Sequence, residues 1–531
     1  MDFLQSHPDV SYLVFQLLES KDLKDICLLS KSCNALATPL LYRSVVLEFE
    51  VGWRYQPAGP QEKIFLFSSL LSHLLDDGNA HVRSLVRDVT VRQSMYTNDW
   101  KHVVSEFELS HDVLSALLER LPNVQNIYLY RGSENIALTP ALLDTIASHD
   151  CKPHLHLRDE RGQTPVDMPM PMVRSLKVQE DKEDLDRLLG ACPNLRDLSY
   201  TTLSHAILRF ASVRDRRRPP GPSHRPYVLT PVPRIPPLES MLLQGLHLNP
   251  DQASWWRNGF PSNSLKSLTL GPEDNKGVLE VLSHCSLSLR SFEISTWYSA
   301  RDKETKDKAI DAFLLSFNTL ETLIVKGYSP SIAAIGNHRS LKSLCLHQIE
   351  ELDERRESLS INELKTIDEF CPDLEHLEFD IIQSQKGEWP QNFITAFITN
   401  FPHLRSLKFH VAFGLRSRFS AEEVSDYDNG ENASDNKKNP ITDWIIPRDG
   451  CVKLGEQMSK VLTNSSVKAF LDILTDRDSS LKLRKLTLES GEGEWGPRFA
   501  YTELKRARIF KVSLPLDGNS LPVVKRKYFF Q

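Results

Sequence analysis

The chain has 531 residues, a formal net charge of −6 at pH 7 and eight cysteines without paired spacing. The acidic excess disfavours nucleic acid or an anionic membrane as a bulk electrostatic partner, and no apolar run approaches the roughly 18 residues of a membrane-spanning helix. The N-terminus has no basic region followed by an apolar core, and the cysteines are scattered, so we expect a cytoplasmic or nuclear protein.

Three short amphipathic helices are expected at the N-terminus, within His7–Leu47. The first carries an apolar cluster around Phe15, the second opens at Lys21-Asp22-Leu23, and the third covers Cys33–Leu41. About forty residues make only a marginal hydrophobic core. The segment therefore needs a partner surface, either the rest of its own chain or another protein.

The rest of the chain repeats one six-residue phrase eleven times, with apolar residues at its first, fourth and sixth positions. The copies begin at Val124, Val173, Leu195, Leu238, Leu265, Leu289, Leu320, Leu341, Leu374, Leu404 and Leu483. The alternation at the end of each copy predicts a strand with one buried face. Stretches of helical spacing between the copies are Ala141–Ala147, Leu185–Ala191, Val278–Leu282, Ala309–Phe317, Leu364–Phe370 and Phe393–Phe401. Stacking such units buries both elements, which predicts an α/β solenoid.

Weaker strand signals and one more helix extend this array. The strands are His154–Leu157, Val45–Phe49 and Leu85–Val91, and the helix is Val467–Leu474. Four copies follow an apolar residue and a proline, at Leu121-Pro122, Cys192-Pro193, Cys371-Pro372 and Phe401-Pro402. Because proline ends the preceding helix, the residue before it should be buried. We therefore interpret Cys192 and Cys371 as core residues.

The chain thus divides into a helical segment (1–47), a repeat region (48–513) and a C-terminal tail (514–531). Two inserts interrupt the repeats. One, near 214–237, is basic and rich in proline. The other, near 420–440, is acidic and poor in apolar residues, a composition typical of disorder.

Several motifs that could carry chemistry are better explained as structure or surface. Gly491–Gly496 matches a dinucleotide loop, but its two glutamates would meet the pyrophosphate. Cys151, His154 and His156 lack a fourth zinc ligand, and Asp426–Gly430 lacks the closing glutamate of a calcium loop. The basic runs Arg214–Arg218 and Lys525–Lys527 are typical of solvated surface, although a nuclear signal would use the same residues. We expect no enzyme, cofactor or metal.

The repeats resemble the irregular leucine-rich repeats of the ribonuclease-inhibitor type, which implies a horseshoe. The asparagine that follows the strand in regular repeats is mostly missing, so its curvature should be uneven. The N-terminal segment resembles an F-box, and most closely that of fungal F-box proteins with leucine-rich repeats. The matching residues are Pro8, Leu13–Leu18, Lys21–Leu23, Leu28–Cys33 and Ala37–Arg43, followed by His81–Leu85 in the first repeat. The sequence departs from the family at His7, where leucine is usual, and in the spacing from Pro8 to Phe15, which is one residue short.

This resemblance implies a non-catalytic substrate adaptor of a Skp–cullin–F-box ubiquitin ligase. The residues that it places at or behind the face docking on the Skp adaptor are Pro8, Leu13, Phe15, Leu18, Asp22 and Leu23. The sequence leaves open whether the apolar ones form an interface or pack the box against the first repeat. The alternative function is a repeat scaffold or inhibitor outside the ubiquitin system, whose N-terminal helices cap the solenoid.

Residues that alternate with the buried leucines should face a protein substrate. These candidates are Tyr128, Tyr130, Lys177, Glu293, Trp297, Tyr298, Lys326, His347, His376, Glu378, Asp380, Lys408 and His410. Their mixed charge indicates a protein partner rather than nucleic acid. The two adjacent aromatic residues would be large anchors if exposed, and the tryptophan could equally cap the edge of the core.

Overall fold

The computed structural model describes most of the helices and strands of the chain and some of the segments that join them. The described residues are 7–54, 62–67, 69–93, 112–131, 138–159, 168–180, 185–202, 235–246, 248, 250–260, 263–271, 275–296, 303–348, 358–382, 389–390, 394, 400–412, 464–475, 483–490, 508–513 and 523–528. They belong to two compact units, Met1–Leu242 and Leu243–Gln531.

The first unit opens with three helices, as the sequence predicted. They are α2 (Pro8–Phe15), α3 (Ser20–Cys27) and α4 (Lys31–Arg43). The side chain of Ser30 accepts a hydrogen bond from the backbone N–H of Cys33 and so caps the start of α4. Strand β1 (Ser44–Arg54) follows α4 directly.

Strands and helices then alternate in the first unit. The helices are α5 (Ser69–Leu75), the 3-10 turn η1 (Asp77–Asn79), α6 (Ala80–Arg83), α7 (Asp112–Glu119), α8 (Pro140–Ser148) and α9 (Leu185–Ala191). The strands are β2 (Glu62–Phe67), β3 (Asp88–Gln93), β4 (Asn126–Arg131), β5 (His154–Asp159), β6 (Val173–Glu180), β7 (Asp197–Thr202) and β8 (Ser240–Gln244), which crosses into the second unit. From β1 through β3 to β7 each strand pairs in parallel with the next, whereas β2 pairs antiparallel with the second half of β1.

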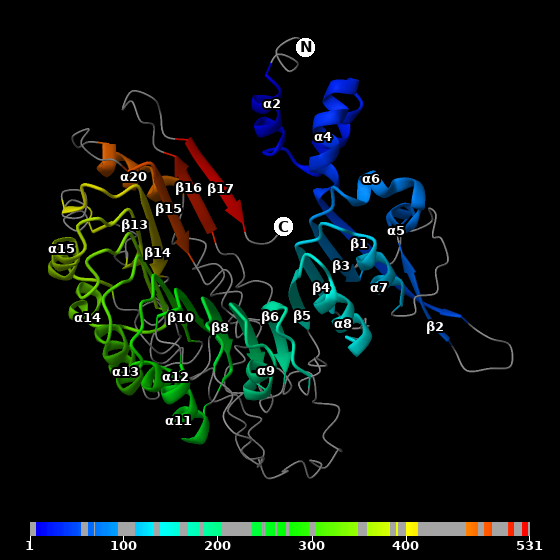
Figure 1. Ribbon diagram of the computed structural model, residues 1–531. Coiled ribbons are helices and arrows are strands. Elements are labelled where there is room, and N and C mark those ends of the chain that lie inside the picture. Colours follow the sequence, from blue (N-terminus) through cyan, green and yellow to red (C-terminus); the bar gives the residue numbers. More distant parts are fainter. Residues whose placement is uncertain are drawn as a thin grey trace, which may run out of the picture. The chain divides into compact units, whose positions relative to one another are not determined.

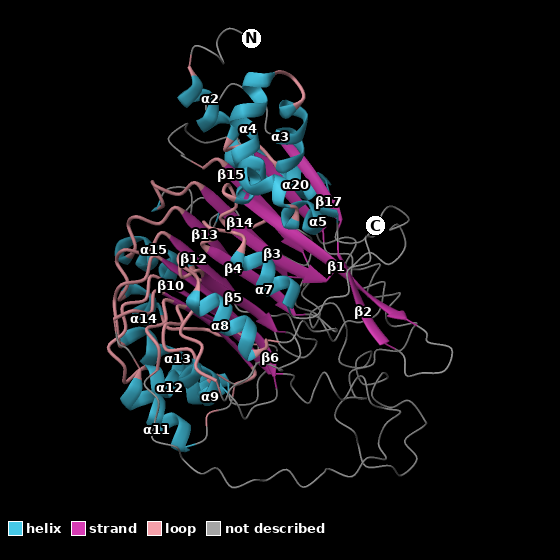
Figure 2. Cartoon of the chain, turned by 45° about the vertical axis from the view of Figure 1, so that its right-hand side comes forward, coloured by secondary structure: helices cyan, strands magenta, loops and turns pink. Residues whose placement is uncertain are grey.

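The second unit repeats the same arrangement (Figures 1 and 2). Its strands are β9 (Ser267–Leu270), β10 (Ser291–Ser295), β11 (Thr322–Lys326), β12 (Ser343–His347), β13 (His376–Ile382), β14 (Ser406–Ala412), β15 (Lys485–Ser490), β16 (Arg508–Ser513) and β17 (Val523–Tyr528). Its helices are α11 (Pro250–Gly259), α12 (Lys276–Leu282), α13 (Lys303–Leu315), α14 (Ile332–Gly336), α15 (Ile361–Phe370) and α20 (Asn464–Thr475). Strands β9 to β15 are parallel, and β15, β16 and β17 are antiparallel.

The repeated phrase has the structure that its period predicts. Every copy leads into or forms a strand, and the residues at the first and fourth positions of all eleven copies are at most 4% exposed. Helices cover the same face as these buried side chains, as shown by the ring contacts of Phe292 with Phe313 (4.9 Å) and of Phe409 with Phe470 (5.6 Å). Cys192 and Cys371 are fully buried, which confirms them as core residues. This is a leucine-rich-repeat-like pattern of parallel strand–helix units.

Backbone hydrogen bonds join successive copies at one recurring point. The N–H groups of the second and third residues of a copy donate to the carbonyl of the second residue of the copy before, as Glu321 and Thr322 do to Arg290. In the second unit the side chains at this second position alternate in charge along Arg290, Glu321, Lys342, Glu375 and Arg405. Ion pairs join three neighbouring pairs of this series, Arg290 with Glu321, Glu321 with Lys342 and Glu375 with Arg405, at N–O distances of 3.9, 3.1 and 3.2 Å.

Some features of the fold were not expected from the phrase. The antiparallel strands β2, β16 and β17 lack it, and β17 lies within the segment expected to be a C-terminal tail. Of the expected helix Phe393–Phe401, the structure describes Ile394 and Asn400 as helical. The two inserts at 214–237 and 420–440 lie outside the described residues.

Candidate binding surfaces

The three N-terminal helices have a hydrophobic core of their own. Phe15, Leu23 and Ala37, one from each helix, are at most 5% exposed, and the partly buried residues packed against them all lie between Leu18 and Leu41. Every side chain of this cluster comes from the helical segment itself. The helices are therefore held together by their own apolar contacts.

The six residues that the F-box resemblance placed at the docking face differ in their burial. Phe15 and Leu23 belong to the core, and Leu18 packs against it, so these three lie behind the surface. Leu13 and Asp22 are exposed. Pro8 begins α2, and its side chain lies outside the described residues.

One apolar face of α2 is exposed. Val10, Leu13 and Val14 recur at intervals that place them on one side of the helix, and Leu17, in the turn directly after α2, is 86% exposed. We call these four residues the apolar face. Just after α3, Leu28 and Leu29 are exposed as well. A cluster of large apolar side chains open to solvent marks an interaction site more often than an isolated exposed residue does.

The strands of the first unit carry a second candidate surface, made of four exposed and two half-buried side chains. In-register pairing aligns Arg92, Tyr130, Arg158 and Lys177 across β3 to β6, and Tyr128 lies beside His156 in the adjacent row. We call these six residues the basic–aromatic strip. The rings of Tyr128 and His156 stack at a centroid distance of 4.4 Å, and the guanidinium carbon of Arg158 lies 5.8 Å from the centroid of the Tyr130 ring.

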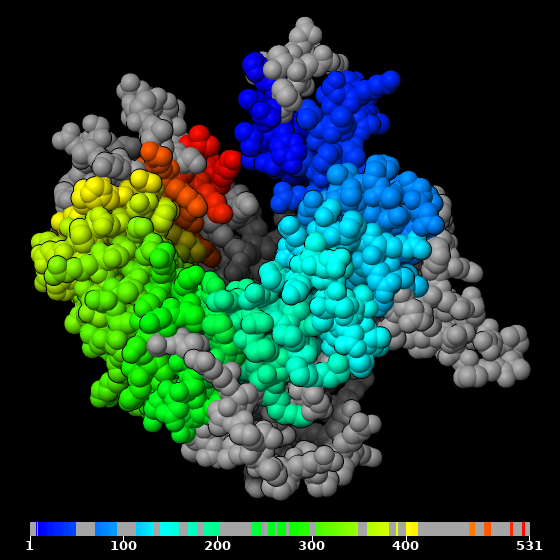
Figure 3. All heavy atoms as spheres, viewed as in Figure 1, coloured from blue at the N-terminus to red at the C-terminus, as the bar shows by residue number. Residues whose placement is uncertain are grey.

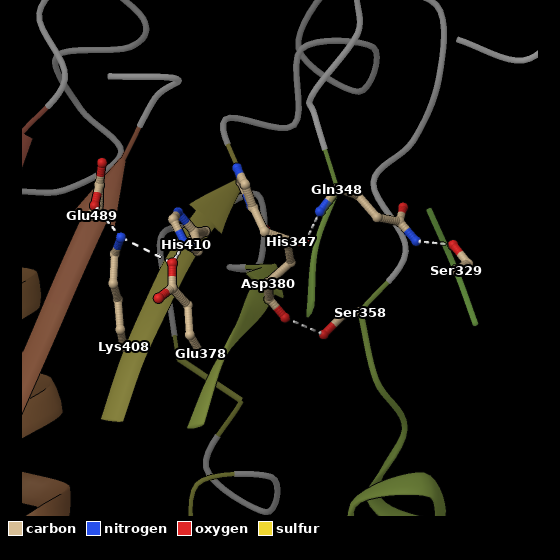
Figure 4. Close-up of polar contacts among 9 residues, drawn as sticks. All are labelled: Ser329, His347, Gln348, Ser358, Glu378, Asp380, Lys408, His410 and Glu489. Carbon is tan, nitrogen blue, oxygen red and sulfur yellow. Dashed lines mark hydrogen bonds and ion pairs between the residues drawn. The ribbon is translucent and has the colours of Figure 1, made fainter. Parts of the chain in front are cut away.

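In the second unit, the residues on the corresponding side of the strands form a polar network instead (Figure 4). His347 Nδ1 donates to Asp380 Oδ1 (2.9 Å), and Asp380 Oδ2 accepts a second hydrogen bond from the backbone N–H of Gln348 (2.6 Å). The imidazole rings of His347 and His410 stack at a centroid distance of 3.8 Å. The carboxylate of Asp380 is therefore held by two donors, His347 at the end of β12 and Gln348 directly after it.

The network continues across β14 and β15. His410 Nε2 lies 2.5 Å from Glu378 Oε1, and Lys408 Nζ lies 3.0 Å from the same oxygen and 2.8 Å from Glu489 Oε2. Figure 4 shows the ammonium group between the two carboxylates. We call His347, Glu378, Asp380, Lys408, His410 and Glu489 the polar network. Each of its charged groups has a partner of opposite charge or a hydrogen-bonding histidine.

The electrostatics follow from burial and from these contacts. Burial alone would raise the pKa of Glu378, but the hydrogen bond with His410 and the charge of Lys408 hold that pKa below its ordinary value. Against burial, Glu378 and Glu489 raise the pKa of Lys408 to about 12. Burial, and next the neighbouring His347, lower the pKa of His410. We therefore assign a neutral His410 that donates Nε2–H to an ionised Glu378 at neutral pH.

Burial at these positions corrects the expectation that they are open to a partner. His347, Asp380 and His410 are 4%, 3% and 6% exposed, although the sequence placed them among the residues facing a substrate. Glu378 and Lys408 are half-buried. These side chains do alternate with the leucines as predicted, but they are satisfied by one another.

The remaining substrate-facing candidates lie in different environments. Glu293 and Lys326 form an ion pair with an N–O distance of 3.6 Å, and both are half-buried. His376 is exposed. Trp297 and Tyr298 lie outside the described residues.

Cys345 lies beside the polar network, but its surroundings do not favour a reactive thiolate. It lies on the same side of β12 as His347 and pairs in register with Glu378. Burial, followed by the charge of Glu378, raises the pKa of its thiol well above the ordinary value. Because the thiolate is the reactive form of cysteine, this environment disfavours a nucleophile.

The structure also places some of the motifs that the sequence raised. Cys151 Sγ donates to the carbonyl of Pro122 (3.1 Å), and His156 contacts Asn126 through Nε2. Within the described part of the chain, no group of three or more His, Cys, Asp or Glu residues could hold a metal ion. Gly491–Gly496, Asp426–Gly430 and Arg214–Arg218 lie outside it. Lys525 lies on β17, where its side chain is exposed.

Sequence reasoning missed Arg92 and Arg158, as well as Gln348, Ser329 and Ser358 beside the network. The two arginines could have been found by extending the strand alternation into the weaker segments β3 and β5. Gln348 Nε2 donates to Ser329 Oγ (2.6 Å), and Ser358 Oγ donates to the Asp380 carbonyl (2.9 Å). These three lie at loop positions, which no strand period predicts.

No family model and no curated protein sequence matches the chain. Solved structures do match, among them the crystal structure of the TLR13–ssRNA13 complex, at 13% sequence identity and a TM-score of 0.33. That match covers 62% of this chain and 47% of the other, so the chain spans about half the length of that protein. A similarity of this size establishes no function. None of the described helices is long and apolar enough to cross a membrane.

Proposed function

We propose that the protein is a non-catalytic substrate adaptor of a Skp–cullin–F-box ubiquitin ligase. In this proposal the helical segment α2–α4 docks on the Skp adaptor, and the strand–helix repeats hold a protein for ubiquitylation. The proposal needs no metal or cofactor. It joins the F-box resemblance of the first fifty residues to a repeat region suited to binding another protein.

The observation that carries the proposal is the apolar face of α2. Residues that merely packed the helices against the repeats would be buried, yet Leu13 and Leu17 are 61% and 86% exposed. The helices (dark blue in Figure 3) already have a separate core around Phe15 and Leu23. Burying such side chains against a partner favours association by about 1.5 to 3 kcal/mol for each one fully covered.

The test is co-purification of the full chain with a Skp adaptor. Leu13→Glu and Leu17→Glu should abolish binding, because each would place a charge in an apolar interface. Leu315→Glu is the matched control, since it makes the same change at an exposed leucine of α13, outside the docking segment, and should leave binding intact. Far-UV circular dichroism checks that all three variants remain folded.

Phe15 is unsuitable for this test because a charge there would disrupt the helical core. If the unaltered chain does not bind the adaptor, or if both leucine variants still bind it, the docking proposal is wrong. That result would favour the repeat scaffold or inhibitor, in which the helices serve only as a cap.

A further inference from the structure

The strands of the two units carry side chains of different charge balance. In the polar network of the second unit, Lys408 lies between Glu378 and Glu489, and His347 is bonded to Asp380. Its one cation and three carboxylates are thus engaged with one another or with a histidine. The basic–aromatic strip of the first unit carries three cations, at Arg92, Arg158 and Lys177, and all three are exposed.

Two carboxylates of the described residues lie near the strip: Asp88 on β3, whose charge acts on Tyr128 and His156, and Glu48 on β1. Glu48 on β1 accepts hydrogen bonds from Nε (2.9 Å) and Nη2 (2.5 Å) of Arg92, and it pairs with that residue in register. Burial, and then His154, lower the pKa of His156, so its ring adds no charge at neutral pH. The three cations of the strip outnumber these two carboxylates of the described residues, and because they are arginine and lysine they stay charged across the neutral range.

The geometry of the strip suits an extended segment. Four parallel strands spaced by about 4.8 Å align the row from Arg92 to Lys177 over roughly 14 Å. Tyr130 is 38% exposed within this row. Stacking of Tyr128 on His156, and of Arg158 on Tyr130, holds the side chains in place before binding, which reduces the entropy lost when a partner binds.

We infer that the basic–aromatic strip binds an acidic peptide segment of a partner protein. Guanidinium groups match carboxylates in charge and shape, and tyrosine and arginine are favoured at interface hot spots. Nucleic acid is the less suitable occupant, because it requires basic residues over an extended surface and the chain as a whole carries a net charge of −6. The inference rests on the proposed function for the fate of the bound protein, and the binding itself is independent of the ubiquitin system.

The test uses the full chain and a fluorescein-labelled twelve-residue peptide of alternating glutamate and serine. Fluorescence anisotropy should show binding that weakens as salt is added, whereas the same peptide with glutamine for glutamate should bind at least about tenfold more weakly. Arg158→Glu and Lys177→Glu should each weaken binding by about tenfold or more. Tyr130→Ala should weaken it as well, without a change of charge.

The matched control is Lys468→Glu, the same charge reversal at an exposed site on α20 in the second unit, and it should bind the glutamate peptide normally. Arg158→Gln provides a milder variant if the reversal unfolds the chain. The inference is overturned if the glutamine peptide binds equally well, or if the strip variants bind like the control. Tighter binding of a labelled oligouridylate than of the glutamate peptide would also overturn it.

Peptide binding by the strip and adaptor binding by the helical segment can be refuted independently of each other. Arg158→Glu and Lys177→Glu should still bind the Skp adaptor, and Leu13→Glu should still bind the glutamate peptide. Loss of peptide binding only in the strip variants supports the inference even if no adaptor binds. Loss of peptide binding in Leu13→Glu would contradict it.

Discussion

At the scale of single residues, burial rather than residue type decides what an ionisable side chain can do. His347 and His410 were expected to face a partner, yet each is committed to a neighbouring carboxylate and to the other ring. Buried charges remain stable only when they are paired and hydrogen-bonded. The polar network is therefore a structural element of the second unit, and its loss should reduce stability.

Lys408→Met tests this role. The change removes the cation between Glu378 and Glu489 and leaves the two carboxylates without it, so the free energy of unfolding should fall by about 3 kcal/mol or more. Urea denaturation followed by circular dichroism measures the loss. Lys342→Met removes an exposed ion pair with Glu321 and should change stability by less than about 1 kcal/mol. Equal effects of the two variants would show that the network contributes no more than a surface pair.

His338 should make stability depend on pH. Burial lowers the pKa of His338 from 6.5 to about 4, against a weaker opposing effect of the backbone of Leu314. Between these values the unfolded chain binds more protons than the folded one. The free energy of unfolding should therefore decrease as the pH falls from 6.5 towards 4, by up to about 3 kcal/mol.

The measurement for His338 is urea denaturation at several pH values. In His338→Leu this part of the pH dependence should disappear. Leu341→Ala, which alters a buried apolar residue three positions away, should lower stability by about 2 to 5 kcal/mol at every pH. A pH profile of His338→Leu parallel to that of the unaltered chain would exclude His338 as its source.

At the scale of elements, backbone geometry singles out one glycine after β11. Gly327 has φ +81°, and a Cβ atom there would lie 2.5 Å from Thr296 Cγ2 and 2.9 Å from the Thr296 carbonyl oxygen. Its N–H donates to the carbonyl of His347 (2.6 Å). This bond and the positive φ bring the chain close to β12, where only glycine fits without strain.

Gly327→Ala should lower the melting temperature, with a loss of about 1 to 3 kcal/mol. Gly277 is the matched control, because it lies in α12 and a Cβ atom there would meet nothing within 4 Å. The same substitution at Gly277 should raise stability by up to about 1 kcal/mol, since alanine favours a helix. Thermal denaturation of the two variants should thus shift in opposite directions. A shift in the same direction would contradict the structural reason given for Gly327.

At the scale of the whole molecule, the helical segment and the repeats have separate cores. The apolar cluster of α2–α4 involves residues between Phe15 and Leu41, whereas the repeats bury the leucines of their own phrase. A chain of residues 44–531 should therefore keep the circular dichroism spectrum expected of the strand–helix repeats and remain soluble. Aggregation of this shortened chain would instead support the capping role of the helices.

Much of the strand–helix pattern could be predicted because its signal is local. A strand alternates its side chains between two faces whatever surrounds it, so apolar residues at the first, fourth and sixth positions marked both the strand and its buried face in all eleven copies. The same regularity predicted Cys192 and Cys371 as core residues. The antiparallel strands β2, β16 and β17 lack the phrase, so no repeat pointed to them.

The candidate surfaces were predicted less completely, because they depend on residues distant in the chain. The sequence by itself determined which positions alternate with the leucines and that three apolar helices come first. Only the tertiary structure decided that Phe15 is core while Leu17 is exposed, and that His347 is enclosed while Lys177 is open. The physical reason is that a strand or helix sets the direction of its own side chains, whereas the neighbours that bury or pair them come from other elements.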